Sequence, residues 1–338
     1  MHVLVTGGLG YIGSHTCVEL ARDGHALTIV DNLANSKLSV LERIRELAPG
    51  ASIEFVRADV RDAAALENAF VGTRIEAVVH FAGLKSVAES MAKPALYLDN
   101  NVGGTAVLLQ AMQRHGVEEI VFSSSATVYG LPEQLPYTES HRLQPANPYG
   151  TSKLEVERLL ARQAAERSGF RYAALRYFNP IGAHPSGRIG EDPRGIPENL
   201  LPYLTQVALG RLPRLRIFGG DYATPDGTGV RDYLHVMDLA AGHLAALRYL
   251  RERDRSITVN LGAGRGHSVL EVLSAFEKAT GKKVPHEIVA RRPGDIAAYY
   301  ADASLAAREL GWQPRYSIED MCRDAWRWQS QNPAGYPD

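Results

Sequence analysis

Tyr149 and Lys153 are the residues of this sequence whose types and spacing point most directly to chemistry. They lie four positions apart in the run YGTSK, and in a helix this spacing places a phenol and an ammonium on one face. A free tyrosine has a pKa of about 10, and a neighbouring cation lowers that pKa, which favours the phenolate as a base. Pro148 suits the first turn of a helix, whose dipole acts in the same direction. The pair predicts a general base, although surface pairs on amphipathic helices often share this spacing.

Three glycines follow the first expected strand. Gly7, Gly10 and Gly13 lie between an apolar run at residues 3–6 and a periodic pattern at residues 11–22 that predicts a helix. In such a turn, glycines permit close approach of the backbone to a pyrophosphate, which the N-terminus of the helix would hold. A lone glycine triplet is also typical of flexible loops, but its place between a strand and a helix favours a dinucleotide site.

Asp31 supports this interpretation from the end of the second expected strand, residues 26–30. An acid at that position accepts hydrogen bonds from the ribose hydroxyls of adenosine and repels a 2′-phosphate. The predicted cofactor is therefore NAD, and NADP is the less favoured alternative. Lys37, a short distance along the chain, is the residue that keeps this alternative open.

The N-terminal half alternates short β-branched runs with longer helical patterns, which is typical of βαβ units. We expect an α/β protein with a Rossmann-type, doubly wound parallel sheet. The expected strands are residues 3–6, 26–31, 53–56, 77–81, 120–124 and 172–177. The longest expected helices are residues 94–115 and 149–168.

Glycine and proline become frequent after about residue 180, and the regular alternation ends there. We therefore expect an NAD-binding domain at residues 1–180 and a smaller C-terminal α/β substrate lobe at residues 181–338. Some segments of this lobe are candidates to return to the first sheet. Its expected helices are residues 199–209, 236–250, 269–279 and 318–329.

The composition is that of an ordinary globular protein. The 338 residues include 37 basic and 38 acidic side chains, so no basic surplus points to nucleic acid or an anionic membrane as a partner. We expect Cys17 and Cys322 to be reduced thiols, and the 11 histidines show no spacing that suggests a metal site. The absence of a leader pattern or a long apolar stretch favours a soluble cytoplasmic protein.

Several motifs extend this interpretation to a family. The glycine-rich turn, HFAG, the serine run SSS and YGTSK occur in the order seen in the extended short-chain dehydrogenase/reductase family. Over the whole chain, the sequence resembles a narrower family, the UDP-glucose 4-epimerases. The motifs that carry this resemblance are GGLGYIGSHT, DNLANS, HFAGLKSVAES, DNNVGGT, SSSATVYG, NPYGTSK, LRYFNPIGAHPSG, GTGVRDYLHVMDLA, NLGAG and RRPGDIAAYYADAS.

The resemblance implies three groups of site residues. The catalytic group is Ser125, Tyr149 and Lys153. The cofactor group runs from the pyrophosphate through the adenosine to the nicotinamide and consists of Gly7, Gly10, Tyr11, Ile12, Gly13, Asp31, Asn32, Leu33, Ala34, Asn35, Ser36, Asp59, Val60, Phe81, Ala82, Gly83, Leu84, Lys85, Asn100, Ser125, Tyr149, Lys153 and Phe178. The substrate group, which would hold UDP and shape the sugar pocket, consists of Lys85, Ser125, Tyr149, Asn179, Asn199, Leu200, Arg231, Arg292, Asp295 and Tyr299.

Structural alternatives remain for five of these residues. Asp59 is also a candidate cap for the following helix, and Asn199 is a candidate N-cap of its own helix. Arg231 and Arg292 could be solvated surface arginines, although their glycine-rich and proline-rich surroundings suit a clamp on a pyrophosphate. Tyr299 could serve packing alone.

The resemblance also implies a reaction. Tyr149 would take the proton of the sugar 4-hydroxyl while NAD⁺ takes the hydride from C4, with Ser125 holding the oxygen. The 4-keto sugar would turn over in the pocket before reduction on its other face, which interconverts UDP-galactose and UDP-glucose. The bulky Tyr299 predicts exclusion of N-acetylated sugars. The resemblance further suggests a homodimer packed through the two long helices.

Two rival functions share the expected fold. A nucleotide-sugar 4,6-dehydratase also uses NAD and a Tyr-Lys pair, but it needs an Asp-Glu pair where this chain has Ala126 and Thr127. A non-catalytic NAD-sensing protein usually lacks a working Tyr-Lys pair, which this chain retains. Both rivals are therefore disfavoured.

Overall fold

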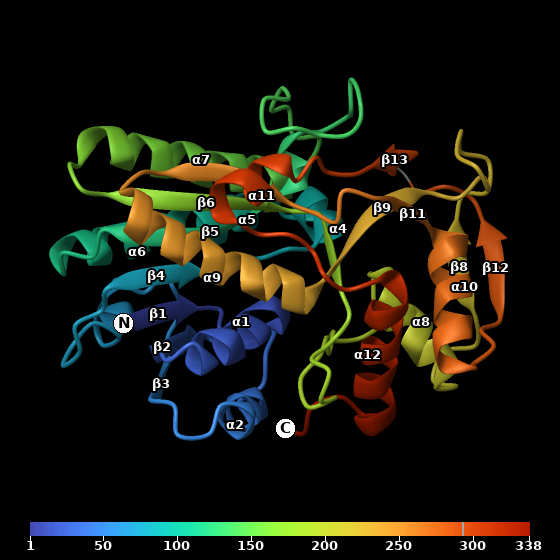
Figure 1. The fold of residues 1–338 in the computed structure, drawn as a ribbon, viewed down its shortest axis with the longest axis horizontal. Helices are drawn as coiled ribbons and strands as arrows, with labels where there is room; N and C mark the ends of the chain where they lie inside the picture. Colours follow the sequence, from blue (N-terminus) through green and yellow to red (C-terminus); the bar gives the residue numbers. More distant parts are fainter. Residues whose placement is uncertain (293) are drawn as a thin grey trace.

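A parallel β-sheet forms the centre of the first part of the molecule in the computed structural model, which describes residues 1–292 and 294–338. The order of its strands is β10-β6-β5-β4-β1-β2-β3, so the chain winds outward in both directions from β1 (Figure 1). This order confirms the predicted doubly wound fold. The strands are β1 (His2–Thr6), β2 (Ala26–Asp31), β3 (Ile53–Arg57), β4 (Ala77–His80), β5 (Glu119–Ser125), β6 (Arg171–Tyr177) and β10 (Ile257–Leu261).

Helices cover both faces of this sheet. Val3 and Val5 of β1 pack in one apolar cluster with α1 (Tyr11–Arg22), α2 (Ser39–Leu47) and α9 (Val236–Arg253). Leu4, between the two valines, points to the other face because side chains alternate along a strand. On that face the sheet packs against α3 (Ala63–Glu67), α6 (Gly104–Arg114) and α7 (Pro148–Glu166). Burial on both sides accounts for the continuous apolar runs of these strands.

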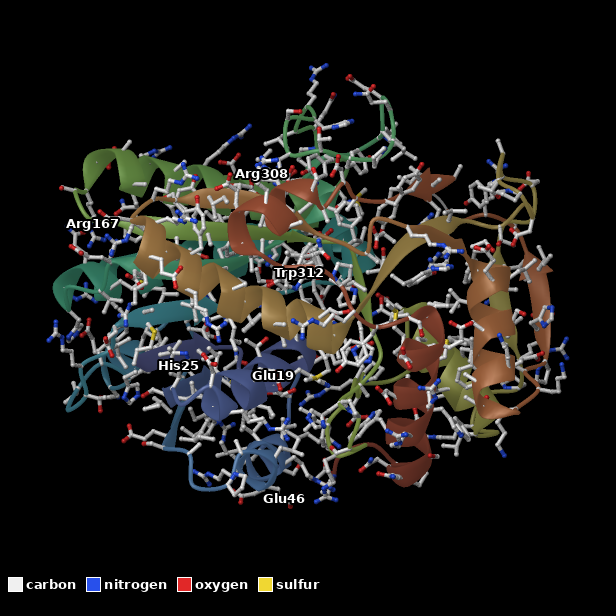
Figure 2. All side chains as sticks on the ribbon, in the orientation of Figure 1. Glu19, His25, Glu46, Arg167, Arg308 and Trp312 are labelled. Carbon is white, nitrogen blue, oxygen red and sulfur yellow. The ribbon has the colours of Figure 1, made fainter. Side chains whose placement is uncertain are left out.

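The segment from α9 to β10 returns from the second half of the chain to the first sheet. β10 pairs in parallel with β6, with Ile257 opposite Ala173 and Leu261 opposite Tyr177. The indole N–H of Trp312, which follows α11 (Ser304–Leu310), donates to the carbonyl of Asp238 in α9 at 2.9 Å (Figure 2). The part of the chain after residue 180 therefore supplies one edge of the first sheet and helices on one of its faces.

The remaining elements form the smaller lobe on the right of Figure 1. One sheet joins β11, β9 and β13, with β7 also paired to β9, and a second sheet pairs β8 with β12. The strands are β7 (Asn179–Ile181), β8 (Leu215–Phe218), β9 (Val230–His235), β11 (Gly266–Ser268), β12 (His286–Val289) and β13 (Ala298–Tyr299). The helices around a shared apolar core are α8 (Leu200–Ala208), α10 (Val269–Thr280) and α12 (Ile318–Gln331).

The long helix predicted at residues 94–115 is present over residues 94–114, but it is not α-helical throughout. After α4 (Val87–Ala92), the chain forms α5 (Pro94–Tyr97), a π-helical turn η1 (Leu98–Gly103) and then α6. A π turn adds a residue to the ordinary helical repeat and often marks a functional site. Within the described residues, none of the helices is long and apolar enough to span a membrane.

Candidate active site

Helix α7 positions Tyr149 and Lys153 in its first turns. The side chain of Asn147 caps this helix by accepting a hydrogen bond from the N–H of Gly150 at 2.8 Å, and Pro148 occupies the first turn as expected. Lys153 is buried, and its ammonium lies 5.9 Å from the centroid of the Tyr149 ring. The two side chains therefore lie on one face of the helix, as their spacing predicts.

The surroundings of Tyr149 do not by themselves produce the predicted low pKa. Burial raises the pKa of Tyr149 above its ordinary value, and a hydrogen bond with Ser125 only partly opposes this effect. Burial also lowers the pKa of Lys153 to about 8. The Lys153 ammonium donates to the carbonyl of Ser123 at 2.7 Å, so β5 rather than the phenol holds it.

Ser125 ends β5 beside the phenol. Its hydroxyl oxygen accepts hydrogen bonds from the N–H and the hydroxyl of Thr127, at 3.2 and 2.9 Å. Because both contacts use Ser125 as an acceptor, its own proton is free to bond to Tyr149 or to a substrate oxygen. Thr127 thus orients Ser125.

The glycine-rich turn lies against the carboxyl end of β4. Gly7 has φ = 69°, and a Cβ atom there would lie 2.7 Å from the nitrogen of Ala82. A Cβ atom at Gly13 would lie 2.3 Å from the carbonyl oxygen of Gly7. Both positions therefore require glycine. Gly10 takes the N-cap position of α1, so Tyr11 and Ile12 begin the helix with their N–H groups directed to the turn.

Asp31 organises the loop that follows β2. Its carboxylate accepts hydrogen bonds from the N–H of Leu9 at 3.1 Å, the N–H of Leu33 at 2.9 Å and the hydroxyl of Ser36 at 2.7 Å. Within this loop, the side chain of Asn32 accepts from the N–H of Ala34 at 2.9 Å. The predicted ribose residues therefore form one turn around a carboxylate, with Asn35 exposed at its edge.

Asp59 joins this group from the loop after β3. The amide of Asn32 donates to it at 3.0 Å, and the guanidinium of Arg61 binds both of its oxygens at 2.9 Å. These contacts hold the pKa of Asp59 well below its ordinary range. Asp62 rather than Asp59 caps the following helix, so the capping alternative for Asp59 is wrong. Val60, the other predicted adenine residue, is buried beside it.

Residues 81–85 form the predicted nicotinamide loop, and Asn101 holds it. The Asn101 side chain accepts from the N–H of Leu84 at 2.8 Å and donates to the carbonyl of Leu84 at 3.1 Å and to the hydroxyl of Ser152 at 2.9 Å. A Cβ atom at Gly83 would lie 3.8 Å from the ammonium of Lys153, so the loop borders the catalytic pair. Asn100, the predicted residue, is partly exposed, whereas the buried Asn101 was not among the predicted residues.

Tyr299 joins the predicted substrate residues of the second lobe to the first. Its hydroxyl donates to the side chain of Asn179 at 2.6 Å, and its ring lies 5.9 Å from the ring of Phe178. The guanidinium of Arg231 lies 4.9 Å from the centroid of the Tyr299 ring and donates to two backbone carbonyls. The side chain of Arg231 is only 16% exposed, so it is not a solvated surface arginine.

Arg292 faces the same cluster from the other side. It donates to Asp295 at 3.1 Å, and Arg231 lies 3.9 Å from the same carboxylate. Its guanidinium also lies 4.6 Å from the centroid of the Phe218 ring at the end of β8. Two arginines and an aromatic face thus meet at one place. Sequence reasoning missed Phe218, and only its position at a strand end could have indicated it.

Glu191 connects two further predicted residues. Its carboxylate accepts from the amide of Asn199 at 2.8 Å and from the ammonium of Lys85 at 3.4 Å. Asn199 occupies the N-cap position of α8, immediately before Leu200, but its side chain bonds to Glu191 instead of capping. Glu191 was not predicted, because it lies in an irregular stretch without a periodic pattern.

Comparisons with known proteins match the whole chain. A protein-family model described as GDP-mannose 4,6 dehydratase matches residues 4–325. A UDP-glucose 4-epimerase of Bacillus subtilis is 54% identical over 336 residues, which cover 99% of each chain. The chain belongs to the UDP-glucose 4-epimerase family.

Solved structures of this family agree. The UDP-glucose 4-epimerase of Stenotrophomonas maltophila with bound NAD and formylated UDP-arabinopyranose is 55% identical, with a TM-score of 0.96 over 98% of this chain and 99% of that one. The enzyme of Bifidobacterium longum in complex with NAD⁺ and UDP is 50% identical, with a TM-score of 0.95 over 99% and 100% of the two chains.

The description of the family model names a dehydratase, whereas the similar proteins are epimerases. One pair of residues in the site distinguishes the two reactions. A dehydratase needs an acid-base pair after the catalytic serine, but this chain has Ala126 and Thr127 there. Ala126 has no titratable group, and Thr127 uses its N–H and hydroxyl to orient Ser125. The local chemistry therefore suits the epimerase family and not a dehydration.

Proposed function

We propose that this protein interconverts UDP-galactose and UDP-glucose by reversible oxidation at C4 of the sugar. The observation that carries the proposal is the phenol of Tyr149, which has the buried ammonium of Lys153 5.9 Å from its ring centroid and Ser125 as a neighbour. A chemically suited cluster of two arginines, Arg231 and Arg292, lies in the second lobe. The comparisons support the same reaction, because the relatives with this full-length similarity are UDP-glucose 4-epimerases.

The residues of the first lobe fit NAD. The tight turn at Gly7 leads directly into the N-terminus of α1, whose first N–H groups suit a pyrophosphate, and Asp31 offers carboxylate oxygens to ribose hydroxyls. Lys37 does not favour NADP, because its ammonium is bound to the carbonyl of Tyr336 at 2.7 Å and to Asp338 at 3.0 Å. We infer that the turn, the Asp31 loop and residues 81–85 hold the cofactor.

Tyr149 moves the proton in this proposal. When bound, NAD⁺ would supply the hydride acceptor and a positive charge. Since burial raises the pKa of Tyr149, an added positive charge would favour loss of the phenol proton and make Tyr149 a better base. Tyr149 would then accept the proton of the 4-hydroxyl and later return it, while Ser125 donates a hydrogen bond to the sugar oxygen.

The second lobe holds the nucleotide in this proposal. Arg231 and Arg292 are planar donors that suit a pyrophosphate, and the face of Phe218 suits stacking on a base. An epimerase must let the oxidised sugar turn over, so its binding free energy has to come from the UDP part. A clamp of charged groups around UDP, with few charged groups at the sugar, satisfies this requirement.

The assay that tests the proposal combines turnover with analysis of the bound nucleotide. Protein purified without added cofactor should contain NAD or NADH and should convert UDP-galactose to UDP-glucose. Turnover is measured by chromatography of the sugar nucleotides, and the cofactor by absorbance after denaturation. Protein that turns over only with freely exchanging NAD would contradict the proposal. A 4-keto-6-deoxy product would favour the dehydratase.

The same assay also tests whether the pocket excludes sugars with a larger substituent. The Tyr299 hydroxyl is fixed on Asn179 and its ring on Phe178, so this bulky side chain cannot easily withdraw to admit a larger sugar substituent. We expect UDP-N-acetylgalactosamine to react much more slowly than UDP-galactose. Comparable rates for the two sugars would refute the role of Tyr299.

We also propose that the protein is cytoplasmic and forms a homodimer. Apolar side chains of α4, α5 and η1, which pack beside α7, are exposed at Val87, Met91, Leu96 and Leu98. Such a patch is typical of an interface. We expect sedimentation to report twice the mass of the chain, and Met91→Glu to shift the protein toward monomer. A monomeric wild-type protein would contradict the proposal.

A further inference from the structure

The loop that follows β2 has a strained backbone. In this ribose loop, residues 31–39, Leu33 adopts φ = 61°, a left-handed conformation that is uncommon for residues other than glycine. Asp31 accepts from the N–H of Leu33 and the hydroxyl of Ser36, while Asn32 and Asn35 are exposed. A loop that is strained and largely exposed needs contacts from outside to keep one shape.

Residues 332–338, here called the brace segment, supply such contacts. The ammonium of Lys37 donates to the carbonyl of Tyr336 at 2.7 Å and lies 3.0 Å from the carboxylate of Asp338. The hydroxyl of Ser39, the first residue of α2, donates to the carbonyl of Pro337 at 2.6 Å. Figure 1 accordingly shows the C-terminal end of the chain beside α2.

The brace segment is itself anchored in the second lobe. The side chain of Tyr336 is buried, with its ring 4.4 Å from that of Trp328 in α12. Its hydroxyl accepts from the N–H of Gly190 at 2.9 Å and lies 3.1 Å from the carbonyl of the same residue, to which it donates. Its N–H donates to Asp192 at 3.0 Å. These contacts fix the position of the Tyr336 carbonyl, which accepts the hydrogen bond from Lys37.

Residues 188–194, which include the partners of Tyr336, also contact the ribose loop, α2 and two predicted substrate residues. Arg194 donates to the carbonyl of Leu33 at 3.2 Å, and Arg188 forms an ion pair with Glu46, which Figure 2 labels on α2. Glu191 of the same stretch accepts from Lys85 and Asn199. One piece of the second lobe thus joins the ribose loop to the predicted substrate residues.

We propose that the brace segment is a positioning element for the cofactor. It holds the ribose loop in the shape that receives the adenosine ribose, so that NAD stays bound while the sugar is oxidised and reduced. Lys37 and Tyr336 are its positioning residues and touch neither substrate nor reacting atoms. This inference rests on the proposed function, since it requires that NAD binds at Asp31.

The test measures how fast NAD leaves the purified holoenzyme. The double variant Lys37→Met, Ser39→Ala removes the hydrogen bonds from the ribose loop to the brace segment. We expect it to lose NAD at least about tenfold faster than wild type, the effect of losing one charge-assisted hydrogen bond. Saturating NAD should restore kcat, whereas KM for NAD should rise. Lys37→Arg should retain NAD better than the double variant.

Two further variants separate this role from others. Tyr336→Phe keeps the ring against Trp328 but loses both bonds to Gly190, so it should release NAD faster without altering any charge near the ribose. Lys278→Met removes an exposed lysine on α10 and should behave as wild type. Wild-type release rates in both the double variant and Tyr336→Phe would overturn the inference. A wild-type protein without NAD would instead refute the proposed function.

Discussion

Replacing Tyr149 with phenylalanine should lower the rate of epimerisation by about 10²- to 10⁴-fold, the usual contribution of a positioned general base. The variant keeps the ring that packs edge-to-face on Tyr97 at 6.5 Å between centroids, so the local packing should survive. It loses only the phenol hydroxyl, which has Ser125 as a neighbour. We therefore expect NAD and UDP-galactose to bind to the variant almost as they bind to wild type.

The measurement is kcat for UDP-galactose, together with bound NAD and a titration with UDP. Tyr172→Phe is a suitable control, because Tyr172 lies at the start of β6, at the opposite end of that strand from Tyr177 and the predicted site. That control should leave kcat unchanged. Near-normal turnover by Tyr149→Phe would remove Tyr149 from the role of base, even if the protein proved to be an epimerase.

The positions of the central strands could be predicted because each strand carries its own local signal. Residues 26–31, for example, form an apolar run that ends at an acid, and β2 has these bounds in the structure. The place of β10 could not be predicted. Its sequence, ITVNL, would suit an edge strand of either lobe, and only its pairing with β6 decides between them.

The π-helical turn escaped prediction for a related reason. Residues 94–115 have a helical pattern throughout, but Asn101 forms hydrogen bonds with Leu84 and Ser152, which are distant in the sequence. An asparagine inside a helix is a weak signal of such a contact, because its side chain competes for backbone groups. Tertiary contacts rather than local propensity therefore set this part of the site.

The residues of the site also divide into those that have a local sequence signal and those that do not. Glycines, Asp31 and the Tyr-Lys pair carry local signals, and the structure places them around one end of the first sheet. Glu191 and Phe218 carry none, since each depends on partners from other segments: Glu191 on Lys85, and Phe218 on Arg292. The roles of all these residues stay predictions until variants are measured.

Lys153→Met is expected to lose most of the epimerase activity and to change how stability depends on pH. The side chain of Lys153 is buried, and burial lowers its pKa from 10.5 to about 8. Such a difference corresponds to about 3 kcal/mol of unfolding free energy, as an order of magnitude. Methionine removes this cost but leaves the carbonyl of Ser123 without its donor, which costs about 1–3 kcal/mol.

The sign of the pH effect follows from proton binding. Below pH 8, Lys153 is protonated in both the folded and the unfolded state, so the cost of burying its charge is constant. Between about pH 8 and 10.5, the unfolded state binds more protons than the folded state, so wild-type stability rises with pH through this window. Methionine does not titrate. The free energy of unfolding of wild type minus that of Lys153→Met should therefore increase over the same window.

Urea unfolding of the nucleotide-free proteins at several pH values from 7 to above 10 measures this difference. Lys93→Met is the matched control, because Lys93 is 60% exposed in its ion pair with Glu89, and its difference from wild type should stay flat. A flat difference for Lys153→Met as well would mean that the folded protein keeps this proton. A buried ammonium with an ordinary pKa requires a strong stabilising partner, and the phenolate of Tyr149 would then be the nearest candidate.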